Sequence, residues 1–152
     1  MTRPMLLCCL LTALSALPFP APAQAPGHWQ ALHAGTRVAG LESRVFRAEY
    51  WWQLTLPGLT AERGFAVEQI GRSAQGRPLR HVQWGNGPTH VLLWSQMHGD
   101  ESTATMALAD LLAWLGDAPD DPRVQQLRQQ LTLHVVPILN PDGAAVFSRR
   151  NA

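Results

Sequence analysis

Cysteine is almost missing from this 152-residue chain, and lysine is missing altogether. The two cysteines, Cys8 and Cys9, lie close to the N-terminus, and all 12 basic residues are arginines. If the first 25 residues are removed on export, the remaining chain has no cysteine, which excludes a disulfide framework there. The folded part must then be stabilised by a hydrophobic core or by a bound metal.

A strong charge imbalance is missing as well. The 11 acidic residues nearly balance the 12 arginines, and the formal net charge is +1. We therefore expect no nucleic-acid partner and no stable contact with an anionic membrane.

No hydrophobic run is long enough to span a membrane. Residues 5–17 form an apolar run after the positively charged Arg3, and an A-x-A cleavage pattern follows at residues 23–25. The run is about half of the ~20 residues that a membrane span needs, whereas the whole pattern is typical of a cleaved secretory signal. We predict a signal peptide at residues 1–25 and a secreted or periplasmic protein. A retained N-terminal tether is the alternative.

The rest of the chain is long enough for one small domain with a core. Residues 26–64 have weak periodicity, apart from an amphipathic helical stretch at residues 45–54, whose aromatic side chains we expect to pack into that core. Residues 65–152 alternate between strand and helix patterns. We predict the fold class α/β, with a mixed, mainly parallel sheet flanked by helices.

The order of these elements brings two separate segments to one edge of the sheet. Strands are expected at residues 65–70, 79–84, 89–96 and 131–139, and helices at residues 102–115 and 123–130. The first two strands form an antiparallel pair. The third is a nearly continuous apolar run, which indicates burial on both faces. The strand–helix–strand succession that follows implies parallel neighbours, whose carboxyl ends share the edge where binding sites form.

His98 and Glu101 follow the third strand at this edge. Zinc accepts imidazole nitrogen and carboxylate oxygen as ligands. A spacing of three lets both side chains reach one point where the backbone turns into a helix, and Gly99 gives that corner conformational freedom. An H-x-x-E pair is weak evidence alone, and a solvated loop is the alternative interpretation. The turn sequence NPDG at residues 140–143 follows the last strand and would lie beside the pair.

Three segments together resemble the zinc carboxypeptidase family, which includes pancreatic carboxypeptidases A and B. The segments are IGRSAQGRPL at residues 70–79, QMHGDE at residues 96–101, and NPDG at residues 140–143 followed by Arg149-Arg150-Asn151. The resemblance covers residues 65–152 and implies the N-terminal part of a carboxypeptidase-like domain. It also implies one Zn2+ ion as cofactor, His98 and Glu101 as its first two ligands, and the C-termini of peptides or proteins as substrates.

Two adjacent arginines compete for one catalytic role. An arginine of the family polarises the substrate carbonyl and stabilises the oxyanion, and Arg150, directly before Asn151, is the better match, with Arg149 as the competing candidate. A planar, permanently charged guanidinium suits developing negative charge. Without the resemblance, both arginines would be interpreted as solvated side chains.

Other polar residues near these segments have simpler explanations. We favour a turn-forming role for Asp142, with support of the metal ligands from behind as the alternative, and we assign Asp100 to capping of the next helix or to solvent. The strand residues His81, His90 and His134 are expected to pack or to form hydrogen bonds rather than to bind metal.

The family site has parts that these segments do not supply. Its third zinc ligand, a histidine, its general base, a glutamate, and the Asn-Arg pair that binds the substrate carboxylate are all expected after Ala152. We therefore predict a fragment of a longer carboxypeptidase, without measurable activity of its own. The alternatives are a genuine short product, a zinc amide hydrolase of the aspartoacylase and succinylglutamate desuccinylase type, and a non-catalytic exported scaffold.

Overall fold

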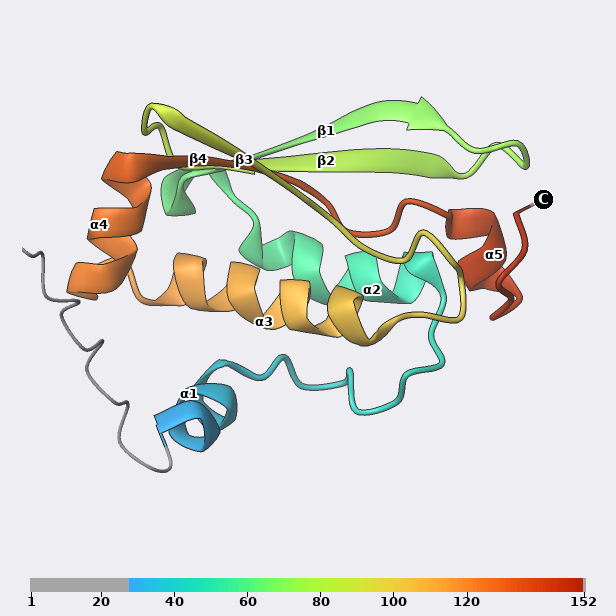
Figure 1. The fold of residues 1–152 in the computed structure, drawn as a ribbon, viewed down its shortest axis with the longest axis horizontal. Coiled ribbons are helices and arrows are strands. Elements are labelled where there is room, and N and C mark those ends of the chain that lie inside the picture. Colours follow the sequence, from blue (N-terminus) through green and yellow to red (C-terminus); the bar gives the residue numbers. More distant parts are fainter. Residues whose placement is uncertain (1–27, 152) are drawn as a thin grey trace, which may run out of the picture.

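A four-stranded sheet with helices against one face makes up the part of the chain that the computed structural model describes, residues 28–151 (Figure 1). The predicted signal peptide lies outside these residues. The elements are α1 (His28–Thr36), α2 (Ala48–Thr55), η1 (Leu56–Gly58), η2 (Ala61–Arg63), β1 (Phe65–Arg72), β2 (Pro78–Trp84), β3 (Thr89–Trp94), α3 (Thr103–Asp117), α4 (Pro122–Gln130), β4 (Leu131–Val136) and α5 (Pro141–Ala145). Among them, no helix is long and apolar enough to cross a membrane.

The sheet is mixed, and its strands lie in the order β1-β2-β4-β3. β1 and β2 form the expected antiparallel pair, and β2 also pairs antiparallel with β4. β3 and β4 are parallel, from Thr89 opposite Leu131 to Trp94 opposite Val136. The mixed α/β class is thus confirmed. The parallel part of the sheet is smaller than predicted, because only one of the three strand pairings within residues 28–151 is parallel.

The prediction that β3 is buried on both faces is wrong for the described part of the chain. β3 is an edge strand, and α2, α3 and α4 lie on one side of the sheet (Figure 1). Its outward side chains are therefore exposed, with Leu92 at 57% and Trp94 at 51% of their full accessible area. The apolar run correctly predicted a strand at this position. It could not predict which strands and helices lie beside that strand.

The core lies between the inner face of the sheet and the helices. Alternate residues of β2 and β4 point inward against the apolar stripe of α3; the buried members are Val82, Trp84, Leu133, Val135, Leu108, Leu112 and Leu115. α2 adds Trp51 and Trp52, whose rings meet edge to face at 4.8 Å. The Trp51 indole also donates a hydrogen bond of 3.0 Å to the carbonyl of Thr105 in α3. The aromatic residues predicted to pack thus do so, except that Tyr50 is exposed.

The chain after β4 differs from the prediction in two ways. The strand ends at Val136, because Pro137 has no N–H group for the ladder. The NPDG turn is a short helix, α5, capped at its start by Asn140, whose side-chain oxygen accepts a 2.8 Å hydrogen bond from the amide of Gly143. An asparagine followed by proline at the first helical position favours a helix start, so the turn residues begin a helix here.

We predict that Trp51→Ala lowers the free energy of unfolding by about 3–5 kcal/mol, because it empties a fully buried site. The same change at Trp94, which is half exposed, should cost less than about 1 kcal/mol. Urea denaturation of both variants measures the difference. Equal losses would contradict the assignment of Trp51 to the core.

Candidate metal and catalytic site

The carboxyl ends of β3 and β4 meet at one edge of the sheet. Beyond the last paired residues, the Leu139 amide donates to the Ser95 carbonyl at 3.1 Å, and the Asn140 amide donates to the Gln96 carbonyl at 3.0 Å. These bonds hold the start of α5 beside the segment that leads to His98. The two segments that the sequence placed at one edge therefore lie together.

His98 and Glu101 direct their side chains at each other. The Nδ1 atom of His98 lies 2.9 Å from Oε2 of Glu101. The turn between them is closed by the amide of Glu101, which donates a 3.1 Å hydrogen bond to the carbonyl of His98. The side chain of His98 is 33% exposed and that of Glu101 is 52% exposed, so both can be reached from solvent. The H-x-x-E spacing thus brings an imidazole nitrogen and a carboxylate oxygen to one point.

Arg149 is the arginine that joins this pair. Its Nη1 atom lies 2.5 Å from Oε1 of Glu101. The hydrogen bond with His98, and after it the one from Arg149, lowers the pKa of the Glu101 carboxyl below its ordinary 4.5. Glu101 therefore stays ionised at neutral pH, as a metal ligand must be.

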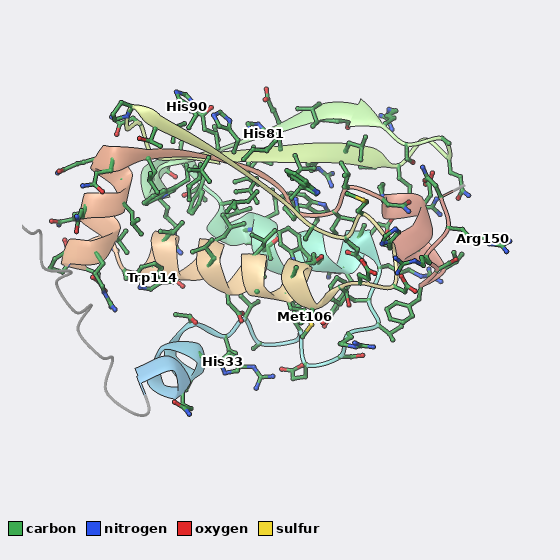
Figure 2. The ribbon with its side chains drawn as sticks, viewed as in Figure 1. His33, His81, His90, Met106, Trp114 and Arg150 are labelled. Carbon is green, nitrogen blue, oxygen red and sulfur yellow. The ribbon has the colours of Figure 1, made fainter. Side chains whose placement is uncertain are left out.

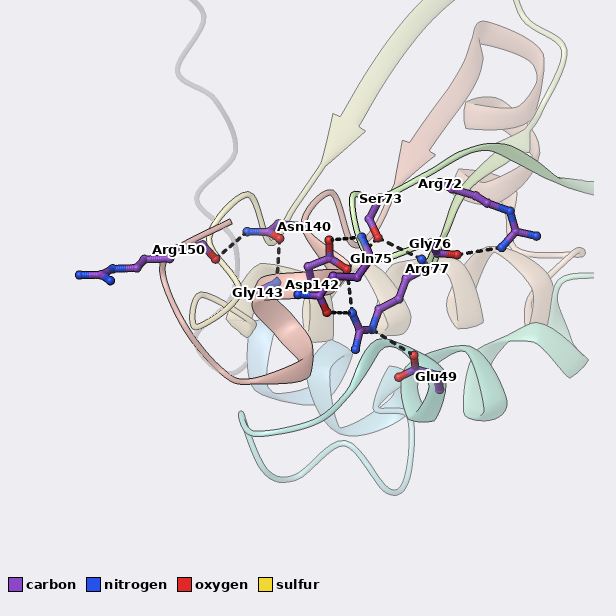
Figure 3. A network of polar contacts seen from close by, with 10 residues as sticks. All are labelled: Glu49, Arg72, Ser73, Gln75, Gly76, Arg77, Asn140, Asp142, Gly143 and Arg150. Carbon is purple, nitrogen blue, oxygen red and sulfur yellow. Dashed lines mark hydrogen bonds and ion pairs between the residues drawn. The ribbon is translucent and has the colours of Figure 1, made fainter. Parts of the chain in front are cut away.

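Arg150 points elsewhere. Its guanidinium projects away from the other labelled residues (Figure 3) and forms no ion pair within residues 28–151. Its main chain is tied down, because its amide donates to the Ser148 hydroxyl at 3.2 Å and its carbonyl accepts from the Asn140 side chain at 3.3 Å. The sequence prefers Arg150 and keeps Arg149 as the competitor, whereas the geometry brings Arg149 to the pair.

Two donor atoms of this pair fit one zinc ion. Tetrahedral nitrogen and oxygen ligands at about 2.0–2.2 Å from zinc stand about 3.3 Å apart. The 2.9 Å between His98 and Glu101 is close to that value, so a small adjustment of the two side chains would accommodate the ion. Within residues 28–151, no group of three or more His, Cys, Asp and Glu side chains is arranged to hold a metal. The described part of the chain thus offers two candidate ligands.

A pocket of about 440 Å³ opens beside Glu101. Its lining includes Trp94, Met97 and Asp100. The Oδ1 atom of Asp100 is buried and has no hydrogen-bond partner among residues 28–151. The predicted cap of α3 by Asp100 is wrong, because no side chain caps this helix; Ser102 stands at the cap position but its hydroxyl donates to the carbonyl of Arg44.

Gln96 belongs to the QMHGDE segment, but the sequence analysis assigned no role to its side chain. It has a left-handed backbone, with φ of 51°, in a buried position directly after β3. Its side-chain amide donates a 2.9 Å hydrogen bond to the carbonyl of Gly99. Backbone strain of this kind persists only where surrounding contacts hold it. No local pattern marks a glutamine for such a role.

Asp142 does more than form a turn, which corrects its assignment. Its side chain is 1% exposed and accepts hydrogen bonds from the Ser73 hydroxyl at 2.7 Å, the Gln75 amide at 3.1 Å and Nη1 of Arg77 at 2.8 Å (Figure 3). Burial alone would raise the pKa of the Asp142 carboxyl, but the three hydrogen bonds outweigh burial and hold that pKa below 3.8. The carboxylate joins the β1–β2 turn to α5, a contact between residues almost 70 positions apart.

The strand histidines form a hydrogen-bonded row across the outer face of the sheet, as expected from their positions in strands. His81 lies 3.0 Å from Glu68 and 3.1 Å from His134, which lies 3.0 Å from His90. Figure 2 shows His81 and His90 on the face away from the helices. His90 lies near the start of β3, whereas His98 follows the end of that strand.

Comparison with known proteins identifies relatives of this arrangement. Residues 60–152 match the family described as zinc carboxypeptidase. The chain is 32% identical over 90 residues to carboxypeptidase SOL1 of Arabidopsis thaliana, covering 55% of this chain and 18% of that protein. It is 30% identical over 111 residues to the human carboxypeptidase N catalytic chain, covering 67% of this chain and 23% of that protein.

A solved structure has a similar fold. The metallo-carboxypeptidase from Burkholderia cenocepacia is 28% identical and superposes with a TM-score of 0.60, over 70% of this chain and 30% of that one. The chain thus spans about a fifth of the curated relatives, at 18% and 23%, and somewhat more of the solved one.

We predict that Arg149→Gln raises the pKa of Glu101 toward 4.5, because it removes a hydrogen bond to the ionised carboxylate. Arg150→Gln is the matched control and should leave that pKa unchanged, since His98 and Arg149 are the groups that lower it. Carbon-detected NMR titration of the glutamate carboxyls in metal-free protein measures both. A shift caused by Arg150→Gln alone would reverse the assignment of the two arginines.

Proposed function

Because the chain belongs to the zinc carboxypeptidase family, we propose that it supplies the first two metal ligands of a secreted or periplasmic hydrolase that cleaves C-terminal peptide bonds. The observation that supports this most directly is the 2.9 Å approach of the His98 imidazole to the Glu101 carboxylate at the sheet edge. The predicted signal peptide at residues 1–25 supports export. The family match favours a peptidase over the amide hydrolase alternative.

In this proposal, His98 and Glu101 hold the ion, and each must be unprotonated at its donor atom. The lowered pKa of Glu101 meets that requirement at neutral pH. Bound zinc would supply a more acidic water and a Lewis acid for the scissile carbonyl. The partly exposed position of the pair leaves room for a substrate to approach from the solvent side.

We propose Arg149, rather than Arg150, as the residue that stabilises negative charge on the substrate carbonyl oxygen. Its guanidinium already lies at the ligand pair, 2.5 Å from Glu101. A fixed positive charge beside the reacting carbonyl lowers the energy of the oxyanion more than that of the neutral carbonyl. Arg149 would have to exchange its bond to Glu101 for one to substrate, which a flexible, exposed side chain can do.

The remaining parts of the site would come from residues that the described part of the chain does not include. A catalytic zinc ordinarily has three protein ligands and one open position. The described residues supply two, and the chain spans 18% to 23% of the curated relatives named above. We therefore propose that a third ligand and a general base lie elsewhere in a longer protein, which would also cover the exposed side of β3.

We predict that the purified chain binds about one zinc ion and that His98→Ala weakens this binding at least tenfold, because one of two ligands is lost. His33→Ala removes an exposed histidine of α1 and should leave zinc affinity unchanged. Competition with a chromophoric chelator measures the dissociation constants. A wild-type chain without bound zinc would favour the non-catalytic scaffold.

We also expect the 152-residue chain to release no amino acid from a blocked dipeptide, because two ligands without a base do not make a catalytic site. Chromatography of the reaction mixture with added zinc tests this. Release that disappears in Glu101→Gln would show that the chain is itself a complete enzyme.

A further inference from the structure

We propose that Asp142 is a positioning residue for the metal ligands, acting through α5 on the turn that holds His98 and Glu101. This inference rests on the proposed zinc site and adds to it the residues that fix its geometry. It depends on two contacts, one between Asp142 and the β1–β2 turn, and one between α5 and Gly99.

The first contact is a buried charged hydrogen-bond network. The Asp142 carboxylate accepts from Ser73, from the Gln75 amide and from Arg77, so its two oxygens are both bound. The turn is itself closed around this site, since the Ser73 hydroxyl accepts from the Arg77 amide at 3.0 Å. Arg77 also lies 3.8 Å from Glu49 of α2. α5 is thereby fixed to the sheet and to a core helix at once.

The second contact, between Gly99 and α5, leaves no space for a side chain at Gly99. A Cβ atom built on Gly99 would stand 1.9 Å from the carbonyl carbon of Gly143 and 2.3 Å from the amide of Ala144. The backbone of the turn from His98 to Glu101, the ligand turn, thus lies in direct contact with the backbone of α5. Gly99 has no positive φ, so this close approach, and not the conformational freedom expected from the sequence, is the reason for glycine here. Any shift of α5 must move Gly99 and the adjacent His98.

α5 also fixes the position of the loop that carries Arg149 and Arg150. The Ser148 amide donates to the Gly143 carbonyl at 2.9 Å, and the Asn140 side chain bridges the Gly143 amide and the Arg150 carbonyl. Arg149 lies between the two bonded positions. One small helix therefore sets the ligand turn on one side and the arginine on the other, and Asp142 sets the helix.

Asp142→Asn tests this with almost no change in volume. The asparagine side chain has no negative charge to pair with Arg77. Its NH2 group would also replace one carboxylate oxygen that accepts hydrogen bonds, so that two donors would face each other there. We expect zinc affinity to fall about tenfold, as happens when residues that orient metal ligands are changed. Ser73→Ala removes one bond to the carboxylate and should give a smaller loss in the same direction.

The matched control is Asp121→Asn. Asp121 is likewise bonded to an arginine, Arg123, but at the start of α4, at the opposite end of the molecule from α5 (Figure 1). It should leave zinc affinity unchanged. Thermal melts identify the temperature at which each variant is fully folded, and affinity is measured there by chelator competition. If Asp142→Asn does not fold, Ser73→Ala decides the result.

A second measurement needs no metal. Hydrogen exchange of the Glu101 amide, which closes the ligand turn, should speed up in Asp142→Asn while exchange in β2 and β4 stays unchanged. Unchanged affinity together with unchanged Glu101 exchange in a folded variant overturns the positioning role. If the wild-type chain binds no zinc, the proposed function fails instead, and the exchange result alone confirms or overturns the link from Asp142 to the turn.

Discussion

The parallel pairing of β3 with β4 is the constraint on which the arrangement of this protein depends. Parallel neighbours need a crossover, and here α3 and α4 provide it on the covered face of the sheet. The two strands then end at the same edge, so whatever follows each of them must meet there. His98 and Glu101 follow one strand and α5 follows the other. The candidate site is a consequence of this topology before any side chain is considered.

Within that topology, backbone contact and a buried carboxylate determine the finer positions. Gly99 touches Gly143 with no space for a side chain, and Asp142 is enclosed by donors from the β1–β2 turn. The three segments that resemble zinc carboxypeptidases are therefore one structural unit. The first segment holds α5, α5 supports the second, and the third contains α5 and continues to Arg149. A resemblance spread over residues 70–151 corresponds to one connected set of contacts.

The electrostatics of the site follow from this unit. Glu101 has two cationic or hydrogen-bonding neighbours and a lowered pKa, while Asp142 is charged in a buried setting because three donors surround it. The two carboxylates differ in exposure, and the proposed roles follow that difference. Glu101 is half exposed, so in the proposed function it would exchange its partners for a metal ion, whereas Asp142 is enclosed and cannot exchange its partners without disrupting α5.

The sequence by itself determined most of the elements and the chemistry at their ends. Local periodicity predicted the four strands β1 to β4 and the helices α2, α3 and α4, though not α5, and the spacing of His98 and Glu101 predicted that they face one point. Both kinds of prediction depend on residues a few positions apart. Tertiary structure alone decided that β3 is an edge strand, that Arg149 and not Arg150 reaches Glu101, and that Asp142 binds Ser73 and Arg77. Each of these depends on the direction of a side chain toward a segment distant in sequence, and no local pattern contains that direction.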